Sequence, residues 1–189
     1  MYRANSNSCC AFCFFVTTAG DNNNDGLTEA TAWRTITYGH SQIAAGDTLH
    51  VKAGHYTDEK INFDRSGLPG KPIVFYGYQN IPRVDPNLNY QINDPLDASV
   101  MPLMEATDSL GRAFDVTNES HLEIRNFQIK DYKSGVHSET GSTYVKMHNL
   151  IGTSYIDTTN FGIYYHADYA TITNCIMIDF GYLHFYLNN

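Results

Sequence analysis

Three stretches of the sequence share one pattern: LEIRNFQI (Leu122–Ile129), VKMHNLIG (Val145–Gly152) and TITNCIMI (Thr171–Ile178). In each, apolar residues alternate with polar ones on both sides of an asparagine, which is typical of two short strands joined at a corner. The asparagines follow one another at intervals of roughly two dozen residues, a period that indicates stacked repeats. The pattern predicts that successive passes of the chain lie on top of one another.

The asparagine at the corner is Asn126 in the first stretch, Asn149 in the second and Asn174 in the third. Asparagine tolerates the left-handed backbone conformation of a sharp corner, and its amide can hydrogen-bond an identical residue above and below. We therefore expect these three side chains to form a column. The alternative is three unrelated turn asparagines, which the flanking alternation makes less favourable.

A third short strand is expected after each corner, at Gly135–Glu139, Gly162–His166 and Leu183–Leu187. Each pass of the chain then contributes three strands. If the first large apolar residue of each of these strands points into the core, alternation predicts which side chains point outward. These are His137, Glu139, Tyr164, His166, His184 and Tyr186.

The register between these strands decides which outward residues stack. We align Val136 with Ile163 and Leu183 in the core. The residues that follow them then form one outward column about 4.8 Å apart from strand to strand, made of His137, Tyr164 and His184. A slip of one residue would turn every side chain over.

The composition agrees with a single domain rich in β-structure. The chain has 189 residues, of which 42% are hydrophobic and only 17% charged, with 14 Tyr and 10 Phe. This length is typical of one domain, and abundant aromatic residues favour strands over helices or disorder. We expect one short helix between Trp33 and Ala44, where apolar residues recur with a helical period.

The net charge limits the classes of ligand. It is -8, from 20 acidic and 12 basic residues, and no run of Lys or Arg is present. Nucleic acid is therefore excluded as an expected partner. An acidic protein also repels acidic polysaccharides, so binding one calls for a local cation, and Ca²⁺ is the expected cofactor.

The N-terminal residues carry little fold information. Three of the four cysteines crowd between Cys9 and Cys13, so they do not resemble a disulfide framework, and no second pair completes a zinc site. The apolar run Cys9–Val16 is too short to span a membrane. We expect residues 1–13 to be a poorly packed leader and residues 14–189 to form the domain.

Three N-terminal motifs carry a resemblance to a known family: FFVTTAGDNNNDGLTEATAWRTI (Phe14–Ile36), AAGDTLHVKAGHYTDE (Ala44–Glu59) and SGLPGKPIVFYGY (Ser66–Tyr78). They resemble the start of right-handed parallel β-helix proteins of the pectate-lyase-like superfamily, especially its bacterial polysaccharide lyases. The resemblance implies a solenoid with three strands per coil and a short N-terminal capping helix. The chain ends at Asn189 without a cap, so we expect further coils beyond it.

Candidate catalytic groups lie around the segment KDYKSG (Lys130–Gly135) and the strand after it. A lyase needs a base that removes the proton α to a uronate carboxylate, and a cation that stabilises the resulting anion. We assign Lys133 and His137 to catalysis, with Lys133 as the base if burial or a neighbouring cation lowers its pKa. Ca²⁺ would bind Asp131 and Glu139, whereas the alternative is that these are solvated loop charges.

The predicted substrate-binding surface is aromatic. Exposed rings on a flat strand face can stack against sugars, and histidines add hydrogen bonds. The residues assigned to it are Tyr132, Tyr164, His166, His184 and Tyr186.

A second calcium candidate is the loop DNNNDGLTEATA, which has Asp21, Asn23, Asp25 and Gly26 at the spacing of a calcium loop. Its twelfth position is Ala32 instead of a bidentate Glu. A plain turn into the capping helix is therefore the favoured interpretation.

The sequence leads to a polysaccharide-active β-helix protein, with Ca²⁺-assisted β-elimination of an acidic glycan as the first hypothesis. The alternative is a non-catalytic carbohydrate-binding or adhesion solenoid. A hydrolase would need paired carboxylates, and Glu139 has no acidic neighbour at the aligned position, where His166 lies. We expect an extracellular or cell-surface protein that is monomeric in its full-length form.

Overall fold

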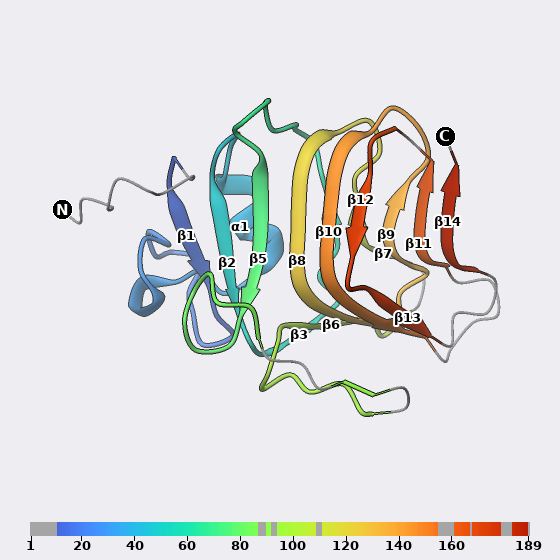
Figure 1. Ribbon diagram of the computed structural model, residues 1–189. Coiled ribbons are helices and arrows are strands. Elements are labelled where there is room, and N and C mark those ends of the chain that lie inside the picture. Colours follow the sequence, from blue (N-terminus) through green and yellow to red (C-terminus); the bar gives the residue numbers. More distant parts are fainter. Residues whose placement is uncertain are drawn as a thin grey trace.

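Almost every regular element of the chain is a β-strand that pairs in parallel with its neighbours (Figure 1). The computed structural model describes residues 11–86, 90–91, 94–108, 111–154, 161–166, 168–178 and 183–188. The strands are β1 (Cys13–Val16), β2 (Thr48–Lys52), β3 (His55–Thr57), β4 (Ile61–Asn62), β5 (Ile73–Tyr78), β6 (Leu103–Glu105), β7 (Arg112–Asp115), β8 (Ser120–Lys130), β9 (Ser134–Ser138), β10 (Thr143–Thr153), β11 (Phe161–His166), β12 (Thr171–Thr173), β13 (Ile176–Ile178) and β14 (Leu183–Asn188).

These strands form two sheets. The larger runs in the order β1-β2-β5-β8-β10-β12, with β13 also paired to β10 and with β6 between β3 and β8. The smaller runs in the order β14-β11-β9-β7-β4. From β7 to β11, consecutive strands alternate between the two sheets, which is a β-helix-like architecture, as the repeats predict.

The core lies between the two sheets and is built from stacked apolar positions. Leu49, Phe75, Ile124 and Met147 occupy one register position on four neighbouring strands, and all four are fully buried. Edge-to-face contacts carry the packing across to the smaller sheet, where the ring of Phe114 lies 6.0 Å from that of Phe75. Period-two alternation therefore places one face of each sheet inside and leaves the other for function.

The predicted asparagine column is confirmed. The Asn149 amide donates to Oδ1 of Asn126 at 2.8 Å, and the Asn174 amide donates to Oδ1 of Asn149 at 3.0 Å. The three residues have φ of 61°, 56° and 52°, so each turns the corner in the left-handed conformation. The Asn126 amide in turn donates to the Gly77 carbonyl oxygen at 2.9 Å, which anchors the column on β5.

A short helix covers the N-terminal end of the core, as expected. It is α1 (Ile36–Gln42), preceded by the 3₁₀ turn Glu29–Thr31. Thr35 caps α1, and the buried carboxylate of Glu59 accepts hydrogen bonds from the backbone N–H groups of Ile36 and Thr37 at 3.1 and 2.9 Å. A negative charge there satisfies the free N–H groups of the first turn.

The loop with calcium-like spacing is a capping turn. Asp21 Oδ1 accepts from the Asn23 backbone at 2.9 Å, and Asp25 Oδ1 accepts from the Leu27 backbone at 3.0 Å and from the Thr31 hydroxyl at 2.6 Å. These oxygens therefore serve the local backbone fold, in agreement with the favoured interpretation.

The first strand lies close to the start of the described residues. Strand β1 begins at Cys13, and Phe12 already donates its backbone N–H to the Asp47 carboxylate at 3.1 Å. Residues 1–10 of the predicted leader lie outside the described residues. In the part of the chain that is described, no helix is long and apolar enough to cross a membrane.

Candidate functional site

A pocket of about 380 Å³ opens on the outer face of the smaller sheet, across β7, β9 and β11. It contains one His, one acidic residue, two cationic residues, one Ser and one Tyr from these strands and the turns beside them. Its lining residues are Arg112, Lys133, Ser134, His137, Glu139 and Tyr164. Four of the residues chosen from the sequence, Lys133, His137, Glu139 and Tyr164, thus come together in one site.

The backbone register explains how the rings of the site meet. His137 on β9 aligns with Tyr164 on β11, and their ring centroids lie 4.8 Å apart with the planes 14° from parallel. His137 also aligns with Asp115 on β7. The predicted stack of His137 on Tyr164 is therefore confirmed.

The prediction that His184 is the third member of the column was wrong. Tyr164 aligns with Tyr186 on β14, and Ile163 aligns with Phe185 instead of Leu183. The register is shifted by two residues from the predicted one, so His184 does not follow Tyr164. A two-residue slip keeps the same residues facing outward. The side chains of β14 lie outside the described residues.

Ion pairs organise the polar side of the pocket. The Arg112 guanidinium donates to Asp115 Oδ2 at 2.5 Å and to Glu139 Oε1 at 2.8 Å. His137 Nε2 lies 3.3 Å from the same Glu139 oxygen. Asp115, at the end of β7, and Glu139, directly after β9, are therefore two acids joined by one cation.

His137 is held in its neutral form. Burial lowers its pKa most, the Arg112 charge lowers it further, and Glu139 and Asp115 oppose the shift. His137 is only 7% exposed, and its Nδ1 is buried without a hydrogen-bond partner among the described residues. The unpartnered nitrogen also disfavours a second proton on the ring.

Asp115 and Glu139, in contrast, have lowered pKa values that favour their charged forms. Hydrogen bonds from Arg112 and then His137 lower the pKa of Glu139. Burial would raise the pKa of Asp115, but hydrogen bonds from Thr117 and Arg112 bring it below its ordinary value. Both carboxylates are therefore ionised near neutral pH.

Lys133 is the one exposed cation of the pocket. The structure gives it no ion pair with a carboxylate of the described residues, whereas Arg112 is bound to two. The side chain of Lys133 is exposed, so burial does not support its use as a base. Its positive charge is instead open to a ligand.

Two of the predicted site residues point elsewhere. Tyr132 is fully buried and donates its hydroxyl to the Glu59 carbonyl oxygen at 2.6 Å, which contradicts a role in binding sugar. Asp131 is 6% exposed, has φ of 60°, and its carboxylate lies 3.8 Å from Lys130 Nζ. The left-handed conformation at Asp131 turns the chain at this corner, and the side chain of Tyr132 enters the core.

The described residues do not fit the predicted calcium site. The Asp131 carboxylate faces Lys130, and the Glu139 carboxylate is bound to Arg112 and His137. Ca²⁺ takes six to eight oxygen ligands, typically with several carboxylates in one place. Within the described ranges, no group of three His, Cys, Asp or Glu is arranged to hold a metal ion.

His166, the remaining predicted residue, is half-buried at the end of β11 and does not line the pocket. Arg112, Asp115 and Ser134 were missed. The available signal was the Arg112–Asp115 strand itself, which aligns with β9 only once the register across the preceding irregular segment is known.

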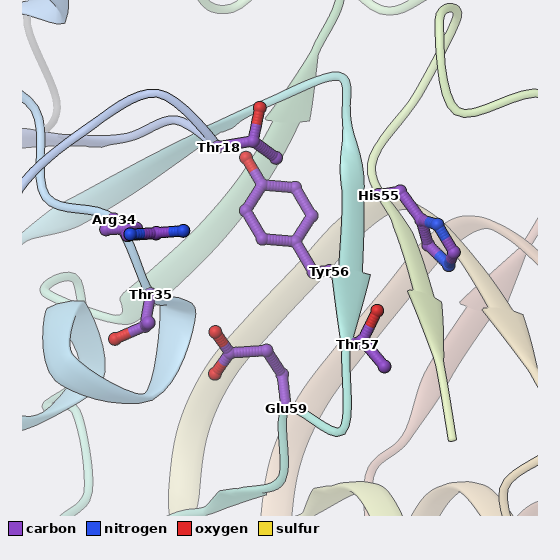
Figure 2. Close-up of a pocket in the computed structure, with 7 residues that line it drawn as sticks. All are labelled: Thr18, Arg34, Thr35, His55, Tyr56, Thr57 and Glu59. Carbon is purple, nitrogen blue, oxygen red and sulfur yellow. The ribbon is translucent and has the colours of Figure 1, made fainter. Parts of the chain in front are cut away.

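A second cavity, of about 340 Å³, lies at the N-terminal end and is lined by Thr18, Arg34, Thr35, His55, Tyr56, Thr57 and Glu59. Figure 2 shows the Glu59 carboxylate turned toward the start of α1 and the Tyr56 ring directed at Thr18. Glu59 caps the helix, and His55 pairs with Glu105 at 2.7 Å. These titratable groups serve the fold, so the pocket on the smaller sheet is the better candidate site.

Comparisons of the sequence with known proteins do not place the chain in a family. No family profile matches the chain. A segment of 66 residues is 35% identical to the uncharacterized protein YwoF of Bacillus subtilis (strain 168), and it covers 35% of this chain and 14% of YwoF. That match is too short to show a family.

Two solved enzymes share the fold at low sequence identity. A rhamnogalacturonan lyase superimposes with a TM-score of 0.57 and 16% identity over 76% of this chain and 36% of the lyase. A GH136 lacto-N-biosidase from Eubacterium ramulus gives 0.54 and 14% over 87% of this chain and 34% of the enzyme. The chain thus spans about a third of each structure, and the likeness shows a β-helix-like fold.

Proposed function

We propose that this chain is part of a right-handed parallel β-helix enzyme that acts on polysaccharides. The enzyme cleaves an acidic glycan by β-elimination in the pocket of Arg112, Lys133, His137, Glu139 and Tyr164. The observation that carries the proposal is a buried histidine, whose pKa is lowered, in one pocket with an exposed lysine that forms no ion pair among the described residues. Fold likeness to a lyase and a glycosidase supports carbohydrate as the substrate class. We place the protein outside the cell, where such polymers are found.

In the proposed reaction Lys133 pairs with the uronate carboxylate, and this makes the neighbouring C–H bond more acidic. Once Glu139 has moved away, the neutral ring of His137 can carry its hydrogen on Nδ1, and the free lone pair of Nε2, the ring nitrogen on the Glu139 side, removes the proton of that C–H bond. The electron pair forms a carbon–carbon double bond as the bond to the glycosidic oxygen breaks. The leaving oxygen takes a proton from solvent water, and the resulting hydroxide is neutralised when the imidazolium later returns its proton to solvent. The charge of Asp115, which aligns with His137 on the neighbouring strand, stabilises the imidazolium that forms.

Glu139 must move for this step, because it occupies the Nε2 edge of His137 in the structure. Its side chain is 59% exposed, so rotation into solvent costs little packing. The Tyr164 ring, stacked on the imidazole, holds the base in place while Glu139 moves.

The paired acids raise hydrolysis as a second candidate reaction. A hydrolase of the usual kind needs one carboxylic acid that is protonated at working pH. Arg112 lowers the pKa of both Asp115 and Glu139, so neither is ready to donate a proton. Elimination with His137 as the base therefore agrees better with the electrostatics of the pocket.

Steady-state kinetics on polygalacturonate, alginate and rhamnogalacturonan test the proposal. His137→Gln should lower kcat about 100-fold or more with KM little changed. Lys133→Gln should raise KM and lower kcat, whereas Lys71→Gln, at an exposed lysine outside the pocket, should change neither.

Binding of these glycans with no turnover by the wild type would select the non-catalytic module instead. Calcium assistance stays a prediction, which the same assay with and without a chelator tests.

A further inference from the structure

A second cluster of polar side chains lies on the larger sheet, away from the pocket. Tyr76 on β5, Arg125 on β8 and His148 on β10 occupy one register position on three neighbouring strands. Asn126, the first asparagine of the column, follows Arg125 at the corner. These four residues, here called the socket, bring together a hydroxyl, a guanidinium, an imidazole and an amide.

All four socket residues face the carboxylate of Asp85. Asp85 Oδ1 accepts from the Tyr76 hydroxyl at 2.7 Å and from the Asn126 amide at 2.9 Å. Asp85 Oδ2 lies 3.3 Å from Arg125 Nη2 and 3.8 Å from His148 Nε2. Donors from three strands therefore converge on one carboxylate.

The donors are held in place by contacts other than Asp85. The Arg125 guanidinium lies over the Tyr76 ring at 5.0 Å and pairs with Glu123 at 3.1 Å. The Nδ1 atom of His148 is 2.7 Å from the Thr173 hydroxyl, which orients Nε2 toward Asp85. Asn126 is fixed by its column, so the socket is preorganised and would keep its shape without the carboxylate.

Asp85 itself sits on a weakly buried segment. Its side chain is 41% exposed, and the neighbouring Ile81 and Val84 are 63% and 54% exposed. Arg83 has φ of 66°, so the segment turns sharply just before Asp85. A segment with so little buried surface is displaced at low cost, although its attachment gives Asp85 a high effective concentration.

The socket favours the charged form of the carboxylate that it binds. Burial would raise the pKa of Asp85, but hydrogen bonds from Asn126 and Tyr76 and the charges of Arg125 and His148 lower it. The bound form is therefore the ionised carboxylate.

A second cation lies on the same outer face. Lys146 precedes His148 by two residues on β10, is exposed, and has no ion pair with a carboxylate of the described chain. Two residues along a strand correspond to roughly 7 Å. A ligand with regularly repeated carboxylates can therefore reach the socket and Lys146 together, which favours an acidic polysaccharide over a single small anion.

We propose that the socket of Tyr76, Arg125, Asn126 and His148 is a second binding site for the carboxylates of an acidic polysaccharide, and that Asp85 is an internal occupant that the ligand displaces. The ligand class rests on the proposed function. The site is on the other sheet from the pocket, so it would hold the polymer without taking part in its cleavage. Competition with Asp85 lowers the apparent affinity.

The test is calorimetric binding of trigalacturonate to the wild type, Asp85→Ala and Asp85→Asn. Removing the internal carboxylate should tighten binding about tenfold or more, and Asp85→Asn should give a smaller gain with less disturbance of the column. Asp94→Ala removes an acid from the same irregular segment without touching the socket and should change nothing. Arg125→Gln should abolish the gain in the Asp85→Ala protein.

The expected gain is also independent of the pocket. It should persist in His137→Gln, so that failure of cleavage and failure of the socket are told apart. Equal affinity in the wild type and both Asp85 variants would overturn the proposal, as would unchanged binding of the fully methyl-esterified trisaccharide. Equally tight binding of an oligoglutamate peptide would overturn the assignment to a polysaccharide.

Discussion

The imidazole of His137 stacks on the ring of Tyr164, with centroids 4.8 Å apart and an interplanar angle of 14°. The two residues come from neighbouring strands of the smaller sheet, and the spacing of parallel strands sets the distance between them. The stack buries the face of the histidine while its Nε2 edge remains beside Glu139. The fold thus supplies both the position and the electrostatic state of the proposed base.

Removing the stacked ring should raise the pKa of His137 toward its ordinary value. Burial is the largest cause of the lowered pKa, and Tyr164→Ala opens the imidazole to water. The measurement is an NMR titration of the His137 ring protons in the two proteins. Tyr144→Ala, which removes a half-exposed ring stacked on His121, is the matched control. An unchanged titration in Tyr164→Ala would show that the stack does not set the pKa.

Breaking the asparagine column should destabilise the fold. Asn149→Ala removes the bonds to Asn126 and Asn174 and puts alanine in a left-handed conformation, which together should cost about 2 to 4 kcal/mol. Asn149→Gly removes the same bonds without the backbone strain and should cost less. Denaturant unfolding measures both, and a glycine variant less stable than the alanine variant would contradict this account.

Tyr132 should behave as a structural residue. Tyr132→Phe removes the hydroxyl bond to the Glu59 carbonyl and should lower the free energy of unfolding by about 1 kcal/mol. Glycan affinity should be unchanged, because the side chain is fully buried. Loss of binding at unchanged stability would restore its predicted role in the site.

The features that the sequence predicted correctly depend on local repetition. Asn126, Asn149 and Asn174 each sit between alternating apolar residues, so their column follows from the pattern. The same alternation predicted that His137 and Tyr164 face outward.

The errors arise where the pairing register of two strands, or the backbone conformation of a corner, decides which side chains come together. His184 was misplaced because a two-residue slip leaves the alternation intact. Tyr132 was taken as an exposed loop residue, whereas the left-handed conformation at Asp131 turns the chain so that the Tyr132 side chain is buried. Arg112 and Asp115 reach the pocket from the preceding pass of the chain. The segment before them has no regular pattern, so the sequence does not show how their strand aligns with β9.

The stability of the protein should fall in mild acid because of His50. Burial, and then the charge of Arg83, lowers the pKa of His50 from 6.5 to about 4. Between these values the unfolded chain binds a proton that the folded one does not, so the contribution of His50 to stability decreases as pH falls from 6.5 to about 4 and does not change further below that. The loss from this group is about 3 kcal/mol.

His50→Leu should remove most of this pH dependence. Unfolding curves at neutral pH and near the lowered pKa of about 4 give the comparison. If the variant loses as much stability on acidification as the wild type, another group is responsible.

The most direct test of the proposed function is to incubate the protein with polygalacturonate and to follow the ultraviolet absorbance of unsaturated uronate ends, with His137→Gln in parallel. β-Elimination predicts a steady rise in absorbance with the wild type, with product masses equal to those of the intact sugar residues without added water, and almost none with His137→Gln. Products that have gained water and lack the absorbance, or an equal rate in His137→Gln, would contradict the assignment of His137 as the base of an elimination.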